Sequence, residues 1–145
     1  MRALLQRVCR ARVLVAGETI GEIGKGLLIF LGIGKHDSEV TCRQLASKVC
    51  RLRIYDDDQG KMNRSLLDIC GAALVVSQFT LYADTDQGLR PSFTNACEPG
   101  RAEGLYERFI TELRYLGVPV QSGRFGARME VELVNSGPVT IMLEA

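Results

Sequence analysis

The stretch that organises this chain is Ala72-Ala73-Leu74-Val75-Val76-Ser77-Gln78-Phe79-Thr80-Leu81. Its first part, Ala72–Val76, is a continuous apolar run, which is typical of a strand buried on both faces. The polar part begins where that strand ends, and α/β proteins commonly place binding groups at such a point. Ser77 and Thr80 offer hydroxyls, Gln78 offers a donor and an acceptor, and Phe79 offers a stacking face. Consecutive main-chain N–H groups in such a turn can hold an oxyanion, although Ser and Thr also simply terminate strands.

Hydrophobic periodicity on either side of this stretch predicts one mixed α/β domain of about seven strands and two helices. A helix capped by Asp37 or Ser38 ends near Arg53, and a second helix begins at Pro99. A long polar loop, Tyr82–Pro99, joins the strand Ala72–Gln78 to the second helix, and loops of this length are usually functional or mobile. The other predicted strands are Ala3–Ala16, Glu18–Ile23, Leu27–Leu31, Pro119–Gln121, Ala127–Val134 and Val139–Leu143.

Composition and charge are those of an ordinary globular protein. The chain has 145 residues, of which 46% are apolar and 24% charged, so we assign residues 1–145 to a single domain with a real core. No apolar run approaches the ~20 residues of a membrane helix, and the charged N-terminus lacks a signal-peptide core. We therefore expect a cytoplasmic protein with no membrane contact. The net charge of +1 predicts that any RNA contact is confined to a small patch.

Cysteine and histidine usage argues against metal chemistry. The five cysteines are scattered without a C-x-x-C pair, which is typical of reduced thiols. His36 is the only imidazole, so a Ser-His or Cys-His mechanism lacks an obvious base. Gly32-Ile33-Gly34-Lys35 does not complete a phosphate-loop motif, and Asp56–Gly60 has its glycine one residue early for a calcium loop. We expect neither a metal ion nor a cofactor.

The step Gly137-Pro138 stands between two predicted strands. Proline cannot donate to a β-ladder, and glycine lets another molecule approach the main chain closely. Before proline the cis peptide is accessible at roughly 0.5–1 kcal/mol, compared with about 3 kcal/mol elsewhere. The pair indicates either a simple turn or a backbone shaped for recognition.

Six short motifs follow one another along the chain. They are Gln6-Arg7-Val8, Gly60-Lys61-Met62-Asn63, Ser77–Leu81, Arg90-Pro91-Ser92-Phe93, Gly123-Arg124-Phe125-Gly126 with Met129, and Asn135-Ser136-Gly137-Pro138-Val139-Thr140. This set closely resembles the D-aminoacyl-tRNA deacylases, over essentially the whole chain. The expected architecture is a three-layer α/β domain with mixed, mostly antiparallel, barrel-like sheets and about two helices packed on one face.

The resemblance implies a homodimer that acts on the aminoacylated acceptor end of tRNA, with active sites at the subunit interface. It implies that Gly137 and Pro138 form a cis chirality gate that enters the partner subunit's pocket. Hydrolysis of D-aminoacyl esters, and of glycyl-tRNA mischarged on alanine tRNA, would occur in that pocket.

Individual site roles also come from the resemblance. It implies that Ser77, Gln78, Phe125, Met129 and Arg7 bind the substrate or brace the site. Phe79 and Thr80 are the implied catalytic pair. Either their main-chain N–H groups stabilise charge while the 2′-OH of the terminal adenosine assists, or the Thr80 side chain is the nucleophile. Because nothing in the sequence obviously activates Thr80, we favour the RNA-assisted route.

Three other functions are compatible with parts of this pattern. One is the editing domain of archaeal threonyl-tRNA synthetases, which removes L-serine. The second is a related deacylase with a trans Gly-Pro step and relaxed chirality, acting on L-aminoacyl-tRNA. The third is a non-catalytic RNA-binding or assembly protein.

Overall fold

The long strand β1 (Arg2–Val15) is the axis of the fold, which the computed structural model describes for residues 1–145. Along one edge β1 pairs antiparallel first with β3 (Gly26–Gly32) and then with β2 (Glu18–Ile23). Along its other edge it pairs antiparallel with β8 (Glu130–Glu144). The sheet continues from β3 through parallel pairing to β6 (Ala72–Ser77) and β7 (Val120–Ser122).

Curvature makes this sheet barrel-like. Strand β2 contacts β6 and β7, although it is hydrogen-bonded to neither. Gly21 of β2 lies so close to β7 that an added Cβ would sit 3.0 Å from the carbonyl oxygen of Ser122. A side chain at this position would push the two strands apart, so the glycine is what permits the close approach.

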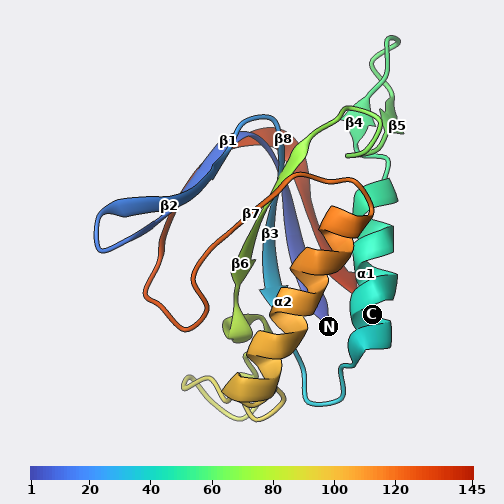
Figure 1. The fold of residues 1–145 in the computed structure, drawn as a ribbon. Helices are drawn as coiled ribbons and strands as arrows, with labels where there is room; N and C mark the ends of the chain where they lie inside the picture. Colours follow the sequence, from blue (N-terminus) through green and yellow to red (C-terminus); the bar gives the residue numbers. More distant parts are fainter.

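The two helices, α1 (Glu39–Arg51) and α2 (Pro99–Tyr115), pack against each other on one face of the sheet (Figure 1). Ser38 caps α1, because its hydroxyl accepts a hydrogen bond from the Thr41 N–H at 3.4 Å. Asp37, the other predicted cap, accepts from the Gly34 N–H at 2.7 Å instead. The predicted mixed α/β fold, with two helices on one face of a mostly antiparallel barrel-like sheet, is confirmed. Neither helix is long and apolar enough to cross a membrane.

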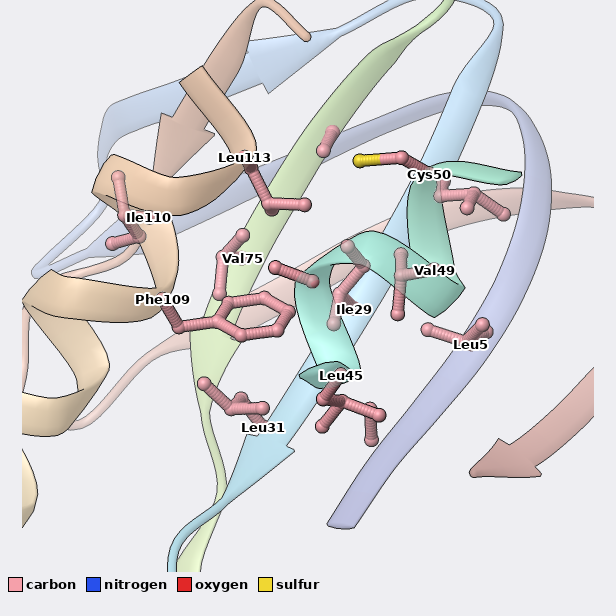
Figure 2. Packing of buried hydrophobic residues seen from close by; sticks show 14 of the residues in the cluster. Leu5, Ile29, Leu31, Leu45, Val49, Cys50, Val75, Phe109, Ile110 and Leu113 are labelled. Atoms are coloured by element: carbon pink, nitrogen blue, oxygen red, sulfur yellow. The ribbon is translucent and has the colours of Figure 1, made fainter. Parts of the chain in front are cut away.

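Two hydrophobic clusters hold the layers together. The larger lies between the sheet and the helices, where Phe109 and Leu113 of α2 and Leu45 of α1 face Ile29 and Val75 of the sheet (Figure 2). The smaller is formed by side chains of the curled sheet: Val8, Ala11, Val13, Ile23, Leu28, Leu74 and Val76. Strand β1 therefore supplies both clusters, which explains its length and its mixed burial pattern.

The structure adds a short hairpin around the expected acidic turn and changes the expectation at Gly137-Pro138. The acidic turn Asp56–Gly60 belongs to a hairpin of β4 (Tyr55–Asp56) and β5 (Met62–Arg64), in which Asp57 accepts hydrogen bonds from the N–H groups of Gln59 and Lys61. Gly137 and Pro138 do not separate two strands, because β8 continues through them with a large bulge. The bulge removes this part of β8 from the ladder, so no interstrand hydrogen bond is lost because proline lacks an N–H.

Candidate functional site

The carboxyl end of β6 opens into a cavity of about 580 Å³. Its lining is mainly apolar and comes from the β6 end, the loop before α2, the first turn of α2 and the loop before β8. Among the predicted site residues, it brings together Ser77, Gln78, Phe79, Phe125 and Met129. Phe93, Cys97 and Ala102 also line it, although the sequence pattern had not assigned them to the site.

The strand end is shaped by a short 3-10 turn, Phe79–Tyr82. The N–H of Gln78 still donates to the β3 carbonyl of Leu31 at 2.8 Å, and the N–H of Leu81 closes the turn onto the Gln78 carbonyl at 3.3 Å. The N–H groups of Phe79 and Thr80 lie between these two bonds and have no acceptor within the turn. Two consecutive main-chain N–H groups, the first on the cavity-lining residue Phe79, are therefore left without an acceptor in the turn.

Thr80 is exposed and does not line the cavity. Its hydroxyl oxygen accepts a hydrogen bond from the side-chain amide of Gln78. No charged or histidine side chain is among the lining residues, so the site contains no general base that could activate this hydroxyl. No group of three or more His, Cys, Asp or Glu side chains elsewhere is arranged to hold a metal ion.

The wall of the cavity is a β-turn, Arg124–Ala127, closed by a 3.2 Å hydrogen bond from the Ala127 N–H to the Arg124 carbonyl. Its third residue, Gly126, has φ +73°, a conformation that favours glycine. Phe125 at the corner packs on the buried ring of Tyr106, with centroids 5.8 Å apart. The Tyr106 hydroxyl donates to the Val75 carbonyl at 2.8 Å, and burial raises the pKa of Tyr106, so it remains a neutral donor. A β6 strand and an α2 side chain thus fix the position of Phe125.

Met129 occupies the space beside Gly123. A Cβ added to Gly123 would lie 2.5 Å from the Met129 sulfur, closer than two unbonded atoms can approach. Glycine at position 123 is therefore what allows Met129 to line the cavity.

At the mouth, Phe79 leaves 57% of its surface exposed and packs edge-on against Phe93, with ring centroids 5.0 Å apart and planes at 70°. Phe93 is carried by the long polar loop, which is anchored by paired main-chain hydrogen bonds of 2.8 Å between Asp84 and Ser92. The sequence signals for its contribution are the length and polarity of that loop and the motif Arg90-Pro91-Ser92-Phe93 within it.

Arg7, Gly137 and Pro138 form a second group, which does not line this cavity. In the pairing of β1 with β8, Gln6 lies opposite Thr140 and Val8 opposite Asn135, so residues 136–139 bulge out opposite Arg7. Arg7 is 8% exposed, and its side chain ties this bulge to the β4 segment. It donates to the carbonyls of Ser136 (3.1 Å), Gly137 (3.3 Å) and Ile54 (2.6 Å), and it lies 3.6 Å from the Asp56 carboxylate.

Asn135 fixes the base of the bulge, because its side-chain amide donates to the carbonyls of Arg7 (2.9 Å) and Val139 (3.1 Å). Within the bulge the Gly137–Pro138 peptide bond is cis. A Cβ added to Gly137 would meet no atom of this chain within 4 Å. Nothing in the protomer therefore requires glycine there, whereas a Cβ added to Gly21 or Gly123 would crowd neighbouring atoms.

Comparison with known proteins places this geometry in a family. The family described as D-Tyr-tRNA(Tyr) deacylase matches residues 4–144. A protein of Roseiflexus sp. strain RS-1 named D-aminoacyl-tRNA deacylase is 60% identical over all of this chain and 94% of its own length. One of the same name from Deinococcus radiodurans is 55% identical over 99% of both chains.

Solved structures show the same fold. The c-Myc DNA Unwinding Element Binding Protein superposes with a TM-score of 0.95 at 40% identity, covering 100% of this chain and 99% of its own. A probable eukaryotic D-amino acid tRNA deacylase superposes with a TM-score of 0.83 at 20% identity, covering 98% and 97%. The match over residues 4–144 and the identities above 50% mean that the chain belongs to the D-Tyr-tRNA(Tyr) deacylase family.

Proposed function

We propose that the protein hydrolyses the ester bond of D-aminoacyl-tRNA and releases free tRNA and a D-amino acid. The observation that carries this proposal is the pairing of an uncharged cavity, flanked by two main-chain donors, with a separate bulge that presents an unobstructed Gly137. Curated relatives at 54–60% identity carry the name of this activity. The protein would act in the cytoplasm, on the acceptor end of tRNA.

The bulge acts on the cavity of a second subunit. Gly137 and Pro138 are outside the cavity lining of their own chain, so they reach an active site only if another copy presents its cavity to them. In a twofold dimer each subunit would give one bulge and receive one, which completes two identical sites. The multiple hydrogen bonds from Arg7 support this role, because they hold the bulge rigid while its glycine faces outward.

The rigid main chain of the bulge would select D- over L-aminoacyl esters by shape. D- and L-aminoacyl esters carry the same groups, and a hydrophobic contact to one methylene is worth only about 1–3 kcal/mol. A fixed backbone wall excludes the L side chain through steric overlap, whereas a flexible side chain would move aside. Glycine has no side chain to exclude, so glycyl-tRNA mischarged on alanine tRNA should also be a substrate.

Catalysis relies on the RNA. The developing oxyanion would accept hydrogen bonds from the N–H groups of Phe79 and Thr80. The 2′-OH of the terminal adenosine would supply the assistance that a protein base gives elsewhere, because no histidine or charged side chain lines the cavity. Thr80 as a nucleophile is less well supported, since its hydroxyl is paired only with the Gln78 amide.

Release assays with tRNAs charged with D-Tyr, L-Ala or Gly test this proposal. We expect hydrolysis of the D-Tyr and Gly esters well above the spontaneous rate and none of the L-Ala ester. Hydrolysis of L-Ala-tRNA would favour the deacylase of relaxed chirality, and no acceleration of any ester would favour a non-catalytic RNA-binding protein.

A further inference from the structure

Arginines without partners lie close along the chain to residues that line the cavity. Nine of the fourteen arginines form an ion pair or a hydrogen bond through the guanidinium group. The other five are Arg10, Arg53, Arg90, Arg124 and Arg128, and all five are exposed. Three of them border the cavity in sequence: Arg124 precedes Phe125, Arg128 precedes Met129, and Arg90 lies three residues before Phe93.

These three arginines approach the cavity from two segments. Arg124 and Arg128 flank the turn that forms its wall, and Arg90 lies two residues before Ser92 in the loop that Asp84 and Ser92 anchor. Main-chain hydrogen bonds thus hold the turn and the loop that carry these cations.

Few acidic groups compete for these cations. Glu98, which precedes the cavity residue Pro99, is occupied by the α2 cap, where its carboxylate accepts hydrogen bonds from the N–H groups of Gly100 and Arg101. Glu130 follows Met129 and has no partner, whereas the unpaired Asp86 of the loop that carries Arg90 lines a separate hollow together with Lys35. The mouth therefore carries a local excess of positive charge, although the chain as a whole has a net charge of only +1.

An aromatic face lies among these cations. Phe79 is more than half exposed at the mouth, and Phe93 supports its ring edge-on. Aromatic side chains interleaved with arginines are the combination that binds single-stranded nucleic acid, through base stacking and phosphate contacts. An acidic peptide would satisfy the arginines but would leave this face uncovered.

We propose that Arg90, Arg124 and Arg128 bind the backbone phosphates of the single-stranded RNA that precedes the terminal adenosine, with Phe79 available to stack on one of its bases. This inference rests on the proposed function, because that function brings an aminoacylated RNA end to the cavity. The arginines bind without regard to base identity, since they contact phosphates. They guide the strand into the cavity and take no part in the ester chemistry.

The test is equilibrium binding of uncharged tRNA as a function of salt, because it does not depend on catalysis. The variant is Arg90→Gln/Arg124→Gln/Arg128→Gln. The control, Arg43→Gln/Arg51→Gln/Arg53→Gln, removes the same charge on and after α1, whose residues do not line the cavity. Three phosphate contacts to a single strand contribute about 2 to the slope of log affinity against log salt. Between roughly 50 and 200 mM salt, the tRNA affinity of the wild type should therefore fall about 20-fold more than that of the cavity variant.

A shallower slope in the cavity variant alone, with a melting temperature equal to that of the wild type, is the expected result. Wild-type affinity and slope in the cavity variant would overturn the inference, and so would an equal loss in the control. Hydrolysis of D-Tyr-tRNA is measured separately with the wild-type protein. If that ester is not hydrolysed above the spontaneous rate while the arginine effect on binding of uncharged tRNA is present, the proposed function fails and the RNA contact stands.

Discussion

Replacement of Gly137 by alanine separates the role of this residue in recognition from any role in folding. The added methyl group meets no atom of its own chain within 4 Å. Folding should therefore be undisturbed, and the smaller entropy of the unfolded chain should raise the free energy of unfolding by about 0.4–1 kcal/mol. In the proposed dimer, the same methyl group projects from the bulge toward the partner's cavity.

The expected loss of activity follows from overpacking a fixed contact. Inserting a methyl group into well-packed surroundings costs about 1–3 kcal/mol, and about 1.4 kcal/mol corresponds to a tenfold change. We expect kcat/KM for D-Tyr-tRNA to fall about 5- to 150-fold, measured by release of D-tyrosine. Gly104→Ala is the matched control, because Gly104 lies exposed in α2 and an added Cβ there also meets nothing within 4 Å. Its activity should equal that of the wild type.

Unchanged turnover of D-Tyr-tRNA by Gly137→Ala, with a melting curve at or above that of the wild type, would refute this reasoning. A large loss of stability would refute it as well, because it would mean that the protomer itself needs glycine at this position.

Three further predictions concern other groups. In Arg7→Lys the ammonium group cannot reach all three carbonyls to which the guanidinium donates. The free energy of unfolding in urea titrations should therefore fall by about 1–3 kcal/mol, and release of L-tyrosine from L-Tyr-tRNA should rise. No change in either quantity would contradict the role of Arg7. Thr80→Ala should keep most of the wild-type rate on D-Tyr-tRNA, whereas loss of most of the rate with tRNA binding intact would make Thr80 the nucleophile. Burial raises the pKa of Cys42 and of Cys50 from 9.0 to about 11. In the unfolded chain these thiols ionise at lower pH than in the folded protein, so the free energy of unfolding should decrease as the pH rises from 9 toward 11. The decrease should be smaller in a Cys42→Ala/Cys50→Ala variant. Equal pH dependence of urea unfolding in the two proteins would exclude this explanation.

Local signals were enough to predict the main elements. The apolar run Ala72–Val76 is short, continuous and followed by polar residues, and it forms β6 in the middle of the sheet. Ser38 and Pro99 mark helix starts through cap chemistry that depends only on neighbouring residues.

Features that depend on pairing were predicted less well. Pro138 suggested a break between strands, but β8 continues because the bulge opposite Arg7 takes proline out of the ladder. In β1, simple alternation places Leu4, Val8 and Leu14 on one face, yet Val8 is buried while Leu4 and Leu14 are only half-buried. The strand serves two different clusters and changes register at its bulges, so a single period does not describe it.

In the candidate site, too, residues set by local sequence could be predicted, and residues set by tertiary packing could not. The contiguous residues Ser77–Phe79 could be placed from sequence because they share one strand end. Phe93 and Ala102 could not, because they reach the cavity only through the packing of a long loop and α2. The support of Phe125 by the buried Tyr106 likewise depends on a tertiary contact.

The central claim is that each active site is shared between two subunits, and co-assembly of two impaired variants tests it most directly. One partner carries Gly137→Ala, and the other carries Ala127→Trp, which fills the cavity that Ala127 lines. If the bulge of one chain serves the cavity of the other, each mixed dimer has one intact site. Random assembly then restores about a quarter of the wild-type rate on D-Tyr-tRNA. A mixture with no more activity than the two separate variants would contradict the claim, because it would place both parts of the site in one chain.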